Sequence, residues 1–415
     1  MSIKKPESVA VVGAGLAGLS CAAKLVESGC SVTVFDAADD VGGRIRTDKV
    51  DGFLLDRGFQ IYLDAYPESS GLLELDDLKL QCFEPGAIIR EGESSHTLMD
   101  VYRRPSSLFA AVFQSNFPLR SKLLIGKLRS YLKGKSIGQI WSIREVSTTE
   151  DYLRDFGFDN RMIELFFRNF YGGIFLEREL QTDSRMFEFT FKMFAEGYAC
   201  LPGRGMQSIP EQIASRLPDG TVRLNQKVEA IEDGVLSLKN QERFEADIIV
   251  LATDGNSANQ LHPEIPIPEW RSTSNLYFTA PVSPLSKKLI ALNGNTECLI
   301  NHLCVITDIA PEYSEDNRSL ISVSLKTFSN LPDEDLVPKV ESELKDWFGD
   351  QVDQWSHLRT YHIRKALPSP VVGHFPLAYD RISDSLYICG DHRSSGSIEG
   401  AIVSGLKTAE AILQQ

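Results

Sequence analysis

Residues 8–27 read SVAVVGAGLAGLSCAAKLVE, and residues 31–36 read SVTVFD. The apolar run over residues 8–12 predicts a strand that is buried on both faces. The pattern over residues 19–27 predicts a helix, and residues 31–35 predict a second strand that ends at Asp36. The glycines between the first strand and the helix form a GxGxxG motif in the context that a dinucleotide site requires. The sequence therefore predicts an α/β protein that begins with a Rossmann-type βαβ unit.

Each glycine of the motif has a separate physical role. Gly13 permits the tight turn, Gly15 lets the backbone approach a pyrophosphate, and Gly18 lets the helix pack closely on the strand. The N–H groups at the start of the helix face the phosphates, and Asp36 is placed to accept a hydrogen bond from an adenosine ribose. These roles do not separate NAD from FAD. The contacts predicted from this unit are Gly13, Gly15, Leu16, Ala17, Gly18 and Asp36.

Length and charge limit the classes of function. The 415 residues are enough for two packed domains. The formal net charge of −14 argues against nucleic-acid binding, which needs a basic surface. No apolar run is long enough to span a bilayer and no signal peptide is recognisable, so a cytoplasmic protein is expected.

The seven cysteines are dispersed, and no two of them form a CxxC pair. An odd, scattered set favours reduced thiols in a cytosol-like compartment over a disulfide framework or a zinc site. We expect each cysteine to act as a small buried hydrophobic residue. No metal site is predicted, because no HExxH or clustered carboxylate pattern stands out.

Two further motifs separate FAD from NAD. VGGR occupies residues 41–44, and LYICGD at residues 386–391 is followed by SSGSIEG at residues 394–400. The latter opens a predicted helix from about Ile398 to Leu413, with apolar residues on one face. With the N-terminal unit, these motifs resemble the flavin-containing amine oxidase superfamily, which also holds protoporphyrinogen oxidases and phytoene or carotene desaturases. LPGRGM at residues 201–206 and ADIIVLAT at residues 246–253 are also similar to family segments, so the resemblance covers the whole chain.

The resemblance implies FAD and assigns residues to it. Arg44 would counter the pyrophosphate charge, although a surface salt bridge is the alternative. Asp391 would bind ribityl hydroxyls, or its N–H would meet a phosphate; a plain turn residue is the alternative. The start of the last helix would face flavin N1 and C2=O. The residues implied beyond the first unit are Gly42, Gly43, Arg44, Gly58, Val228, Thr253, Gly390, Asp391, Ile398 and Ala401.

The FAD is expected to be bound non-covalently, because no cysteine lies between Cys304 and Cys389, where covalent relatives attach it. No second GxGxxG follows a strand, so no separate NAD(P)H domain is expected. The enzyme would be reduced by its own substrate and reoxidised by an acceptor that the sequence leaves open.

The chain is predicted to divide into three parts. Residues 1–75, 200–253 and 371–415 would form a discontinuous FAD-binding domain. Residues 76–199 would form a helical subdomain, and residues 254–370 a mixed α+β substrate-binding domain. Most aromatic rings of residues 166–194 belong to a helical core, but Gly172-Gly173 among them indicates space for a lipophilic pocket. Phe170, Tyr171 and Phe175 are the candidate substrate contacts.

The branch of the superfamily is inferred from a missing lysine. Amine oxidases place a lysine in the strand after the FAD-domain return, where the best local match here is Asn275. This departure favours hydride removal from carbon in a hydrophobic substrate, such as a carotenoid precursor or a porphyrinogen. His392 is the candidate proton acceptor, with a structural histidine as the alternative. An amine oxidase that releases hydrogen peroxide and a non-catalytic lipid or prenyl carrier remain the competing functions.

Residues 101–140 carry a local excess of positive charge. This segment contains eight basic residues and no acidic residue, interleaved with apolar side chains. A basic amphipathic segment can lie in the interface of an anionic membrane. The alternative is a helical subdomain with its cationic face in water. Peripheral membrane contact through 101–140 is therefore a hypothesis for a substrate drawn from a bilayer.

Overall fold

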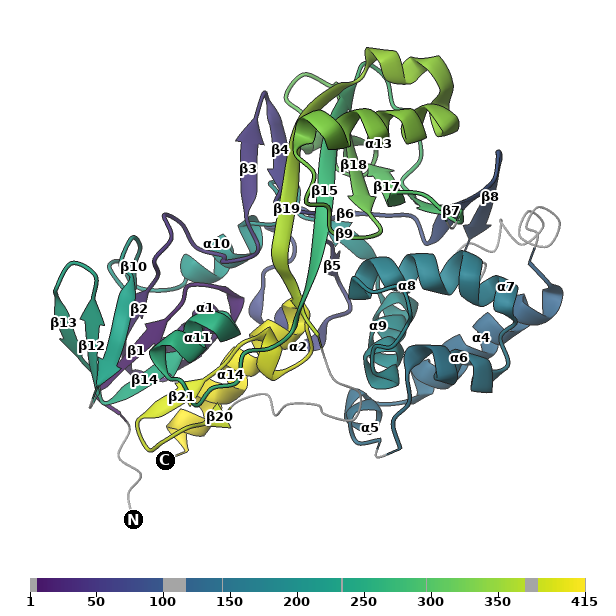
Figure 1. The fold of residues 1–415 in the computed structure, drawn as a ribbon. Helices are drawn as coiled ribbons and strands as arrows, with labels where there is room; N and C mark the ends of the chain where they lie inside the picture. Colours follow the sequence, from purple (N-terminus) through teal and green to yellow (C-terminus); the bar gives the residue numbers. More distant parts are fainter. Residues whose placement is uncertain are drawn as a thin grey trace.

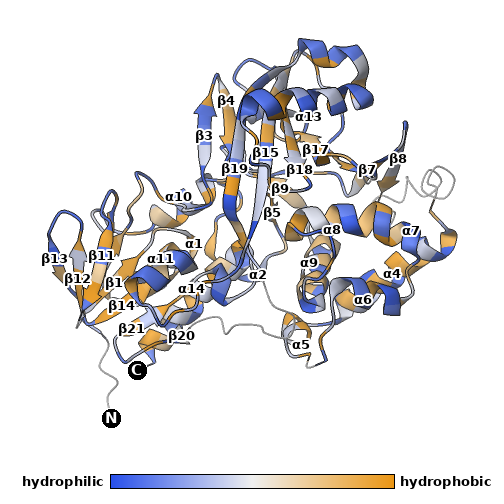
Figure 2. Ribbon diagram, in the orientation of Figure 1, coloured by the Kyte–Doolittle hydropathy of each residue, from blue (hydrophilic) through white to orange (hydrophobic). Residues whose placement is uncertain are grey.

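The computed structural model describes residues 6–99, 117–143, 145–232, 234–295, 297–369 and 380–414. Figure 1 shows three parts: a parallel sheet with its helices, a second sheet that includes two long strands, and a group of helices. Hydrophobic residues concentrate on the inner strands β1 and β14 of the first sheet (Figure 2). The core therefore follows the apolar runs that the sequence places in these strands.

The first sheet has six strands in the order β10-β2-β1-β14-β21-β20. All neighbours are parallel except β20, which is antiparallel to β21. The strands come from the start, the middle and the end of the chain, and β1 and β2 have the bounds predicted from the sequence. Their bounds are Ser8–Val12 for β1, Ser31–Phe35 for β2, Val222–Arg223 for β10, Ile248–Leu251 for β14, Asp380–Arg381 for β20 and Leu386–Ile388 for β21.

Two long helices pack together beside this sheet. Helix α1 spans Leu16–Glu27 and begins three residues earlier than predicted, while α14 spans Ile398–Leu413 as predicted. A Cβ at Gly405 would lie 2.1 Å from the carbonyl oxygen of Ala17, so only glycine permits this close approach. The contact holds the two ends of the chain together.

The second sheet has seven strands in the order β19-β15-β18-β17-β16-β7-β8. Helix α13 (Asp333–Phe348) packs its buried Leu336, Val340 and Leu344 into the core on this sheet. The strands are β7 (Gly86–Glu91), β8 (Ser94–Met99), β15 (Trp270–Ala280), β16 (Ile290–Asn293), β17 (Ile300–Val305), β18 (Ser319–Leu325) and β19 (Ser356–Pro368). The prediction of a helical subdomain over residues 76–199 does not hold at its start, because β7 and β8 belong to this sheet, where β7 pairs with β16.

The helical part lies between residues 119 and 196. A core of buried aromatic rings, including Tyr171, Phe175 and Phe187, fills it. Tyr171 and Phe187 meet edge to face at 4.7 Å between ring centroids, a favourable arrangement for aromatic rings. Its elements are α4 (Leu119–Gly134), α5 (Ile137–Trp141), α6 (Thr149–Phe156), α7 (Asn160–Met162), a π-helical turn (Ile163–Phe167), α8 (Arg168–Phe175) and α9 (Ser184–Glu196).

Short elements connect these parts. Three small sheets occur: β3-β4, β5-β9-β6 and β11-β12-β13. Their strands are β3 (Thr47–Val50), β4 (Phe53–Asp56), β5 (Tyr62–Leu63), β6 (Gln81–Cys82), β9 (Ala199–Leu201), β11 (Val228–Glu232), β12 (Val235–Leu238) and β13 (Arg243–Glu245). The remaining helices are α2 (Pro67–Leu72), α10 (Ser208–Ala214), α11 (Gly255–Leu261), α12 (Ile306–Ile309) and 3-10 turns at Pro311–Tyr313, Gly349–Gln354 and Asp391–Arg393.

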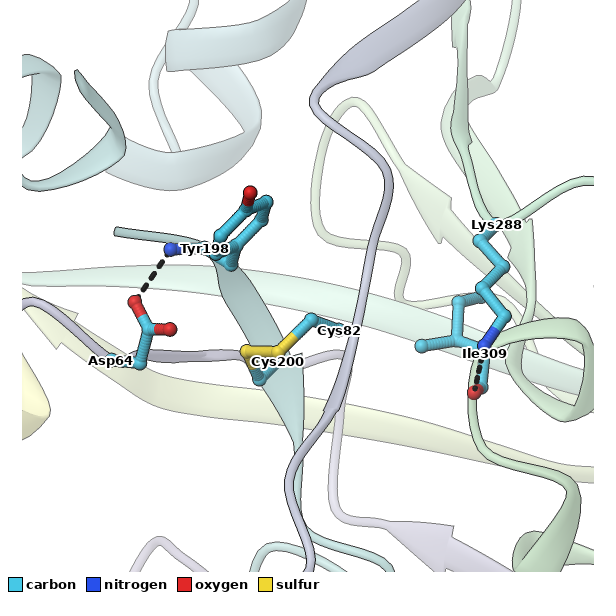
Figure 3. The surroundings of a disulfide bond; sticks show 6 residues. All are labelled: Asp64, Cys82, Tyr198, Cys200, Lys288 and Ile309. Carbon is cyan, nitrogen blue, oxygen red and sulfur yellow. Dashed lines mark hydrogen bonds between the residues drawn. A yellow bond between two sulfur atoms is a disulfide. The ribbon is translucent and has the colours of Figure 1, made fainter. Parts of the chain in front are cut away.

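A disulfide joins Cys82 on β6 to Cys200 on β9 (Figure 3). The expectation that all seven cysteines are reduced is therefore wrong for this pair, since antiparallel pairing brings the two residues opposite each other. A carboxylate oxygen of Asp64 lies within 4.8 Å of both sulfur atoms, but these sulfurs are bonded to each other. The disulfide also removes the argument from cysteine usage for a reducing compartment.

Within the described residues, no helix combines the length and apolarity needed to cross a bilayer.

Candidate cofactor and substrate cavity

A cavity of about 810 Å³ runs from the glycine-rich turn after β1 to the helices α8 and α9. One end, here called the cofactor end, is formed by the loops after β1, β2 and β14 and by the starts of α1 and α14. The other, here called the substrate end, is formed by Phe59–Ile61, α8, α9, β16, β17 and the end of β18. The cofactor end lies at the carboxyl ends of the parallel strands, which is where α/β folds bind nucleotides.

Gly13 and Gly18 are required by the backbone itself, whereas Gly15 is not. Gly13 has φ of +117°, and a Cβ there would lie 2.6 Å from the carbonyl oxygen of Ala252. A Cβ at Gly18 would lie 1.9 Å from the carbonyl oxygen of Gly13, so helix and turn touch at that point. A Cβ at Gly15 would meet no protein atom within 4 Å and would point into open space. Gly15 is therefore not required by the packing of the protein itself.

The start of α1 offers N–H groups at the cofactor end. Its N-cap residue, Gly15, provides no side-chain hydrogen bond, and the first turn contains no acidic residue. Asp36 lies beside this turn, where its carboxylate accepts hydrogen bonds from the N–H of Ala14 at 2.6 Å and of Ala38 at 2.8 Å. The Asp36 carboxylate thus holds the glycine-rich turn in place, and this role is separate from the hydrogen bond predicted with an adenosine ribose.

Arg44 and Asp391 form an ion pair across the cavity wall. The Arg44 guanidinium also donates to the carbonyl oxygen of Ala366 at 3.2 Å and lies over the Trp270 ring. The carboxylate of Asp391 raises the pKa of Arg44, although burial opposes this. The salt bridge considered for Arg44 is therefore present, but its two sides differ: the Asp391 side chain is buried, whereas 37% of the Arg44 side chain is exposed.

The start of α14 is held by a helix cap, a close backbone contact and hydrogen bonds to α2. Ser397 caps the helix by accepting from the N–H of Gly400 at 2.9 Å. A Cβ at Gly400 would lie 1.7 Å from the carbonyl oxygen of Ser395, which excludes any other residue without a backbone shift. The carboxylate of Glu399 accepts from the N–H groups of Glu68 and Ser69 at the start of α2. These contacts fix the helix start at the cavity.

Most of the predicted cofactor residues line the cavity, and Gly18 does not, because it packs against Gly13. Of the predicted substrate contacts, Phe170 lines it, whereas Tyr171 and Phe175 are corrected to the buried core of the helical part. The predicted cofactor residues that line the cavity are Gly13, Gly15, Leu16, Ala17, Asp36, Gly42, Gly43, Arg44, Gly58, Val228, Thr253, Gly390, Asp391, Ile398 and Ala401.

His392 is not among the residues that line the cavity. Its imidazole packs against Gly390, where a Cβ would lie 2.5 Å from the ring, and burial lowers its pKa. The prediction of His392 as the proton acceptor is therefore not supported by its position, because the half-buried ring lies outside the residues that line the cavity. The Asn275 side chain is also absent from the wall, whereas Lys326 and Lys365 line it. A missing lysine at position 275 consequently does not by itself separate amine oxidation from other chemistry.

The substrate end is mainly apolar, with Phe59, Phe170, Ile174, Met186, Phe194, Ile290 and Leu325 on its wall. Its polar groups include Asn301 and His302 on β17 and Lys326 after β18. All the carboxylates that line the cavity among the described residues belong to the cofactor end: Asp36, Glu229, Asp254 and Asp391. No sequence motif pointed to His302, because it is a single histidine in a mainly apolar strand.

Comparison with known proteins agrees with this geometry. The family model of flavin containing amine oxidoreductases matches residues 16–413. The chain is 27% identical over 471 residues to the 15-cis-phytoene desaturase of Capsicum annuum, covering 99% of this chain and 78% of that protein. It is 47% identical to protoporphyrinogen oxidase 2 of Arabidopsis thaliana, but only over 73 residues, 18% of this chain and 14% of that protein. Cyclohexylamine oxidase from Brevibacterium oxydans IH-35A shares the fold, with a TM-score of 0.72, 16% identity and 99% of each chain covered.

The fold and these matches define an FAD-dependent oxidoreductase. The chain belongs to the flavin-containing amine oxidoreductase family. The geometry of the cofactor end is also compatible with FAD. The open space beside Gly15, next to an uncapped helix start, is what a pyrophosphate requires.

Proposed function

We propose that this enzyme binds FAD non-covalently along the cofactor end and dehydrogenates carbon–carbon bonds of a hydrophobic substrate in the substrate end. The observation that carries the choice of substrate is the composition of the wall. Among the described residues, the substrate end combines apolar side chains with no carboxylate. An alkylammonium ion would thus have no anionic partner there, whereas a hydrophobic molecule gains from burial.

Several residues of this chain would hold the cofactor. The N–H groups of Leu16 and Ala17 would donate to the pyrophosphate, and the Arg44 guanidinium would supply positive charge beside Asp391. The start of α14, at Ile398 and Ala401, would direct its N–H groups toward the flavin ring. FAD, when bound, supplies the hydride acceptor.

The protein's own part in the reaction is to bind, orient and exclude water. The substrate loses a hydride from one carbon and a proton from its neighbour, and a double bond forms between them. Phe59, Phe170 and Phe194 present rings to the cavity that would hold an extended or polycyclic molecule. The proton would pass to an acceptor other than His392, because His392 does not line the cavity.

Anaerobic bleaching of the bound flavin tests the proposal. Carotenoid precursors, porphyrinogens, polyamines and aromatic amines would be mixed with the oxidised protein, and the visible flavin band recorded. We expect a hydrophobic polyene or porphyrinogen to bleach it and amines to leave it unchanged. Bleaching by amines alone, with hydrogen peroxide released in air, would establish the amine oxidase alternative, and a colourless protein would favour the carrier.

Helix α4 supports a second part of the proposal, contact with an anionic membrane. Leu119 and Leu123, one turn apart, are 60% and 63% exposed, and Tyr131 is 48% exposed further along the helix. The same helix carries Arg120 and Lys127 on its exposed face and contains no acidic residue. Leu128 and Leu132 face the core instead. The exposed face is therefore both apolar and cationic, as interfacial helices are. Residues 101–116 of the predicted segment lie outside the described residues.

Co-sedimentation with vesicles tests this contact. The variant Leu119→Ser/Leu123→Ser should bind anionic vesicles more weakly than the unmodified protein, and salt should weaken both. Val282→Ser is the matched control, because Val282 is 73% exposed on another part of the surface. Equal binding by both variants, or no binding to anionic vesicles at low salt, would show that α4 is ordinary solvated surface.

A further inference from the structure

The substrate end contains a buried hydrogen-bond donor that neither the fold nor the proposed hydride transfer uses. His302 lines the cavity and is only 6% exposed. Its Nε2 atom has no hydrogen-bond partner among the described residues. A buried polar group without a partner is costly, so its presence in an apolar wall needs an explanation.

The neighbouring amide fixes which ring nitrogen carries the proton. Nδ2 of Asn301 donates to the backbone carbonyl of Asn169 at 3.1 Å, which identifies it as the NH₂ group. The same Nδ2 lies 2.9 Å from Nδ1 of His302, so Nδ1 accepts. In a neutral imidazole the other nitrogen then carries the hydrogen, and Nε2 is a donor. Burial lowers the pKa of His302 to about 4, which keeps the ring neutral near pH 7.

The surroundings hold this arrangement in place. Gly173 on α8 leaves room for it, because a Cβ there would lie 2.7 Å from Nδ2 of Asn301. The Phe59 ring meets the imidazole edge to face at 5.1 Å. The double glycine that the sequence places among aromatic residues therefore makes room for a polar pair as well as for a pocket.

Positive charge lies on the same face of the sheet. His302 is opposite Ser324 in the antiparallel pairing of β17 and β18, and Lys326 follows two residues later, on the same side of the strand. Lys326 lines the cavity while its ammonium donates to the carbonyl oxygen of Asn295. A neutral donor and a cation thus both line the substrate end. Burial lowers the pKa of Lys326, and the Glu343 carboxylate, which does not line the cavity, opposes this shift.

We propose that the substrate carries an oxygen acceptor, such as a carboxylate, that accepts a hydrogen bond from Nε2 of His302 in the part of the cavity that Lys326 also lines. This inference rests on the proposed function, because it concerns the same cavity. It favours a hydrophobic acid, such as a porphyrinogen that bears carboxylates, over a pure hydrocarbon. His302 is then a specificity residue, because a site that is built to bond an oxygen discriminates against analogues lacking it.

A binding measurement on the FAD-loaded protein tests the inference without turnover. Oleic acid and the straight-chain alkene of equal length would be titrated in dilute detergent, with bound-flavin fluorescence as the readout. The unmodified protein should prefer the acid, and His302→Phe should weaken acid binding by about 10- to 100-fold while leaving alkene binding unchanged. His302→Gln, which keeps a donor, should restore part of the preference. His357→Phe is the matched control, since His357 lies on β19 against Phe278 and does not line the cavity.

The pH profile separates a neutral donor from a histidinium ion pair. The preference of the unmodified protein for the acid should persist between about pH 6 and 8, because the ring is neutral throughout. Equal binding of acid and alkene, or a preference that His302→Phe leaves intact, would overturn the inference. Flavin bleaching by hydrocarbon polyenes is measured separately, so the proposed function would survive that result. Loss of the preference between pH 6 and 8 would overturn the assigned tautomer and the inference with it.

Discussion

A substitution at Gly15 should weaken FAD binding without changing the stability of the apoprotein appreciably. A Cβ at this position would meet no protein atom within 4 Å, and its φ of −78° suits any L-residue. Gly15→Val should therefore leave the apoprotein folded. Its side chain would occupy the space beside the start of α1 and would keep a pyrophosphate away from the helix N–H groups.

The size of the effect follows from the bonds lost. A hydrogen bond to a charged group contributes about 1.5–3 kcal/mol, so losing two costs about 3–6 kcal/mol. Since about 1.4 kcal/mol is a factor of ten, FAD affinity should fall by about 100-fold or more. The cost to the apoprotein should be limited to about 1 kcal/mol or less from the poorer N-cap.

Gly18→Ala is the matched control. Its Cβ would lie 1.9 Å from the carbonyl oxygen of Gly13, so the turn must shift whether or not a ligand is present. We expect the free energy of unfolding of this apoprotein to fall by about 1–3 kcal/mol. The assays are urea unfolding of the apoproteins and equilibrium dialysis of FAD. Normal FAD affinity in Gly15→Val would refute the placement of the pyrophosphate.

Four other outcomes are expected. Burial raises the pKa of Asp56 to about 6. The folded state therefore holds the Asp56 proton more tightly than the unfolded state does, and the resulting contribution to the free energy of unfolding is present at low pH and lost as pH rises through about 6. Relative to Asp56→Asn, the unmodified protein should lose about 3 kcal/mol in urea unfolding between about pH 4 and 7, and parallel curves would contradict this. Replacing both Cys82 and Cys200 with serine should lower the unfolding midpoint, by about 2–4 kcal/mol in free energy; an unchanged midpoint would show that the link does not contribute. Gly400→Val, which collides with the carbonyl of Ser395, should lower flavin content or its reduction potential, and full occupancy at an unchanged potential would exclude a role for the start of α14. Acid precipitation should release the FAD into the supernatant, and flavin retained in the pellet would indicate a covalent bond.

The local parts of the fold could be predicted because their signals are local. The strands Ser8–Val12 and Ser31–Phe35 and the helix Ile398–Leu413 have the predicted bounds, since alternation, glycines and helical spacing are read within each segment. The residues that the glycine-rich turn assigns to the cofactor line the cavity, except Gly18, because the turn determines the position of its own neighbours. The residues beyond the first unit followed from the resemblance to the family.

Features that depend on distant pairing could not be predicted. Strand β7 joins the second sheet through a parallel pairing with β16, about 200 residues along the chain, which no local pattern encodes. The disulfide depends on β6 and β9 lying side by side, 118 residues apart. The role proposed for His302 depends on its hydrogen bond with Asn301 and on Gly173 of α8, which packs against this pair. His392 was misplaced because sequence adjacency to Asp391 does not determine on which side of the wall a ring lies.

Product analysis after a single anaerobic turnover tests the central claim, dehydrogenation of carbon–carbon bonds, most directly. The FAD-loaded protein would be mixed with the compound that bleaches its flavin, and the product examined by mass spectrometry. We expect a product that has lost two hydrogen atoms and kept every other atom, with one flavin reduced for each molecule formed. A product in which a carbonyl group has replaced an amine, with ammonia released, would contradict it.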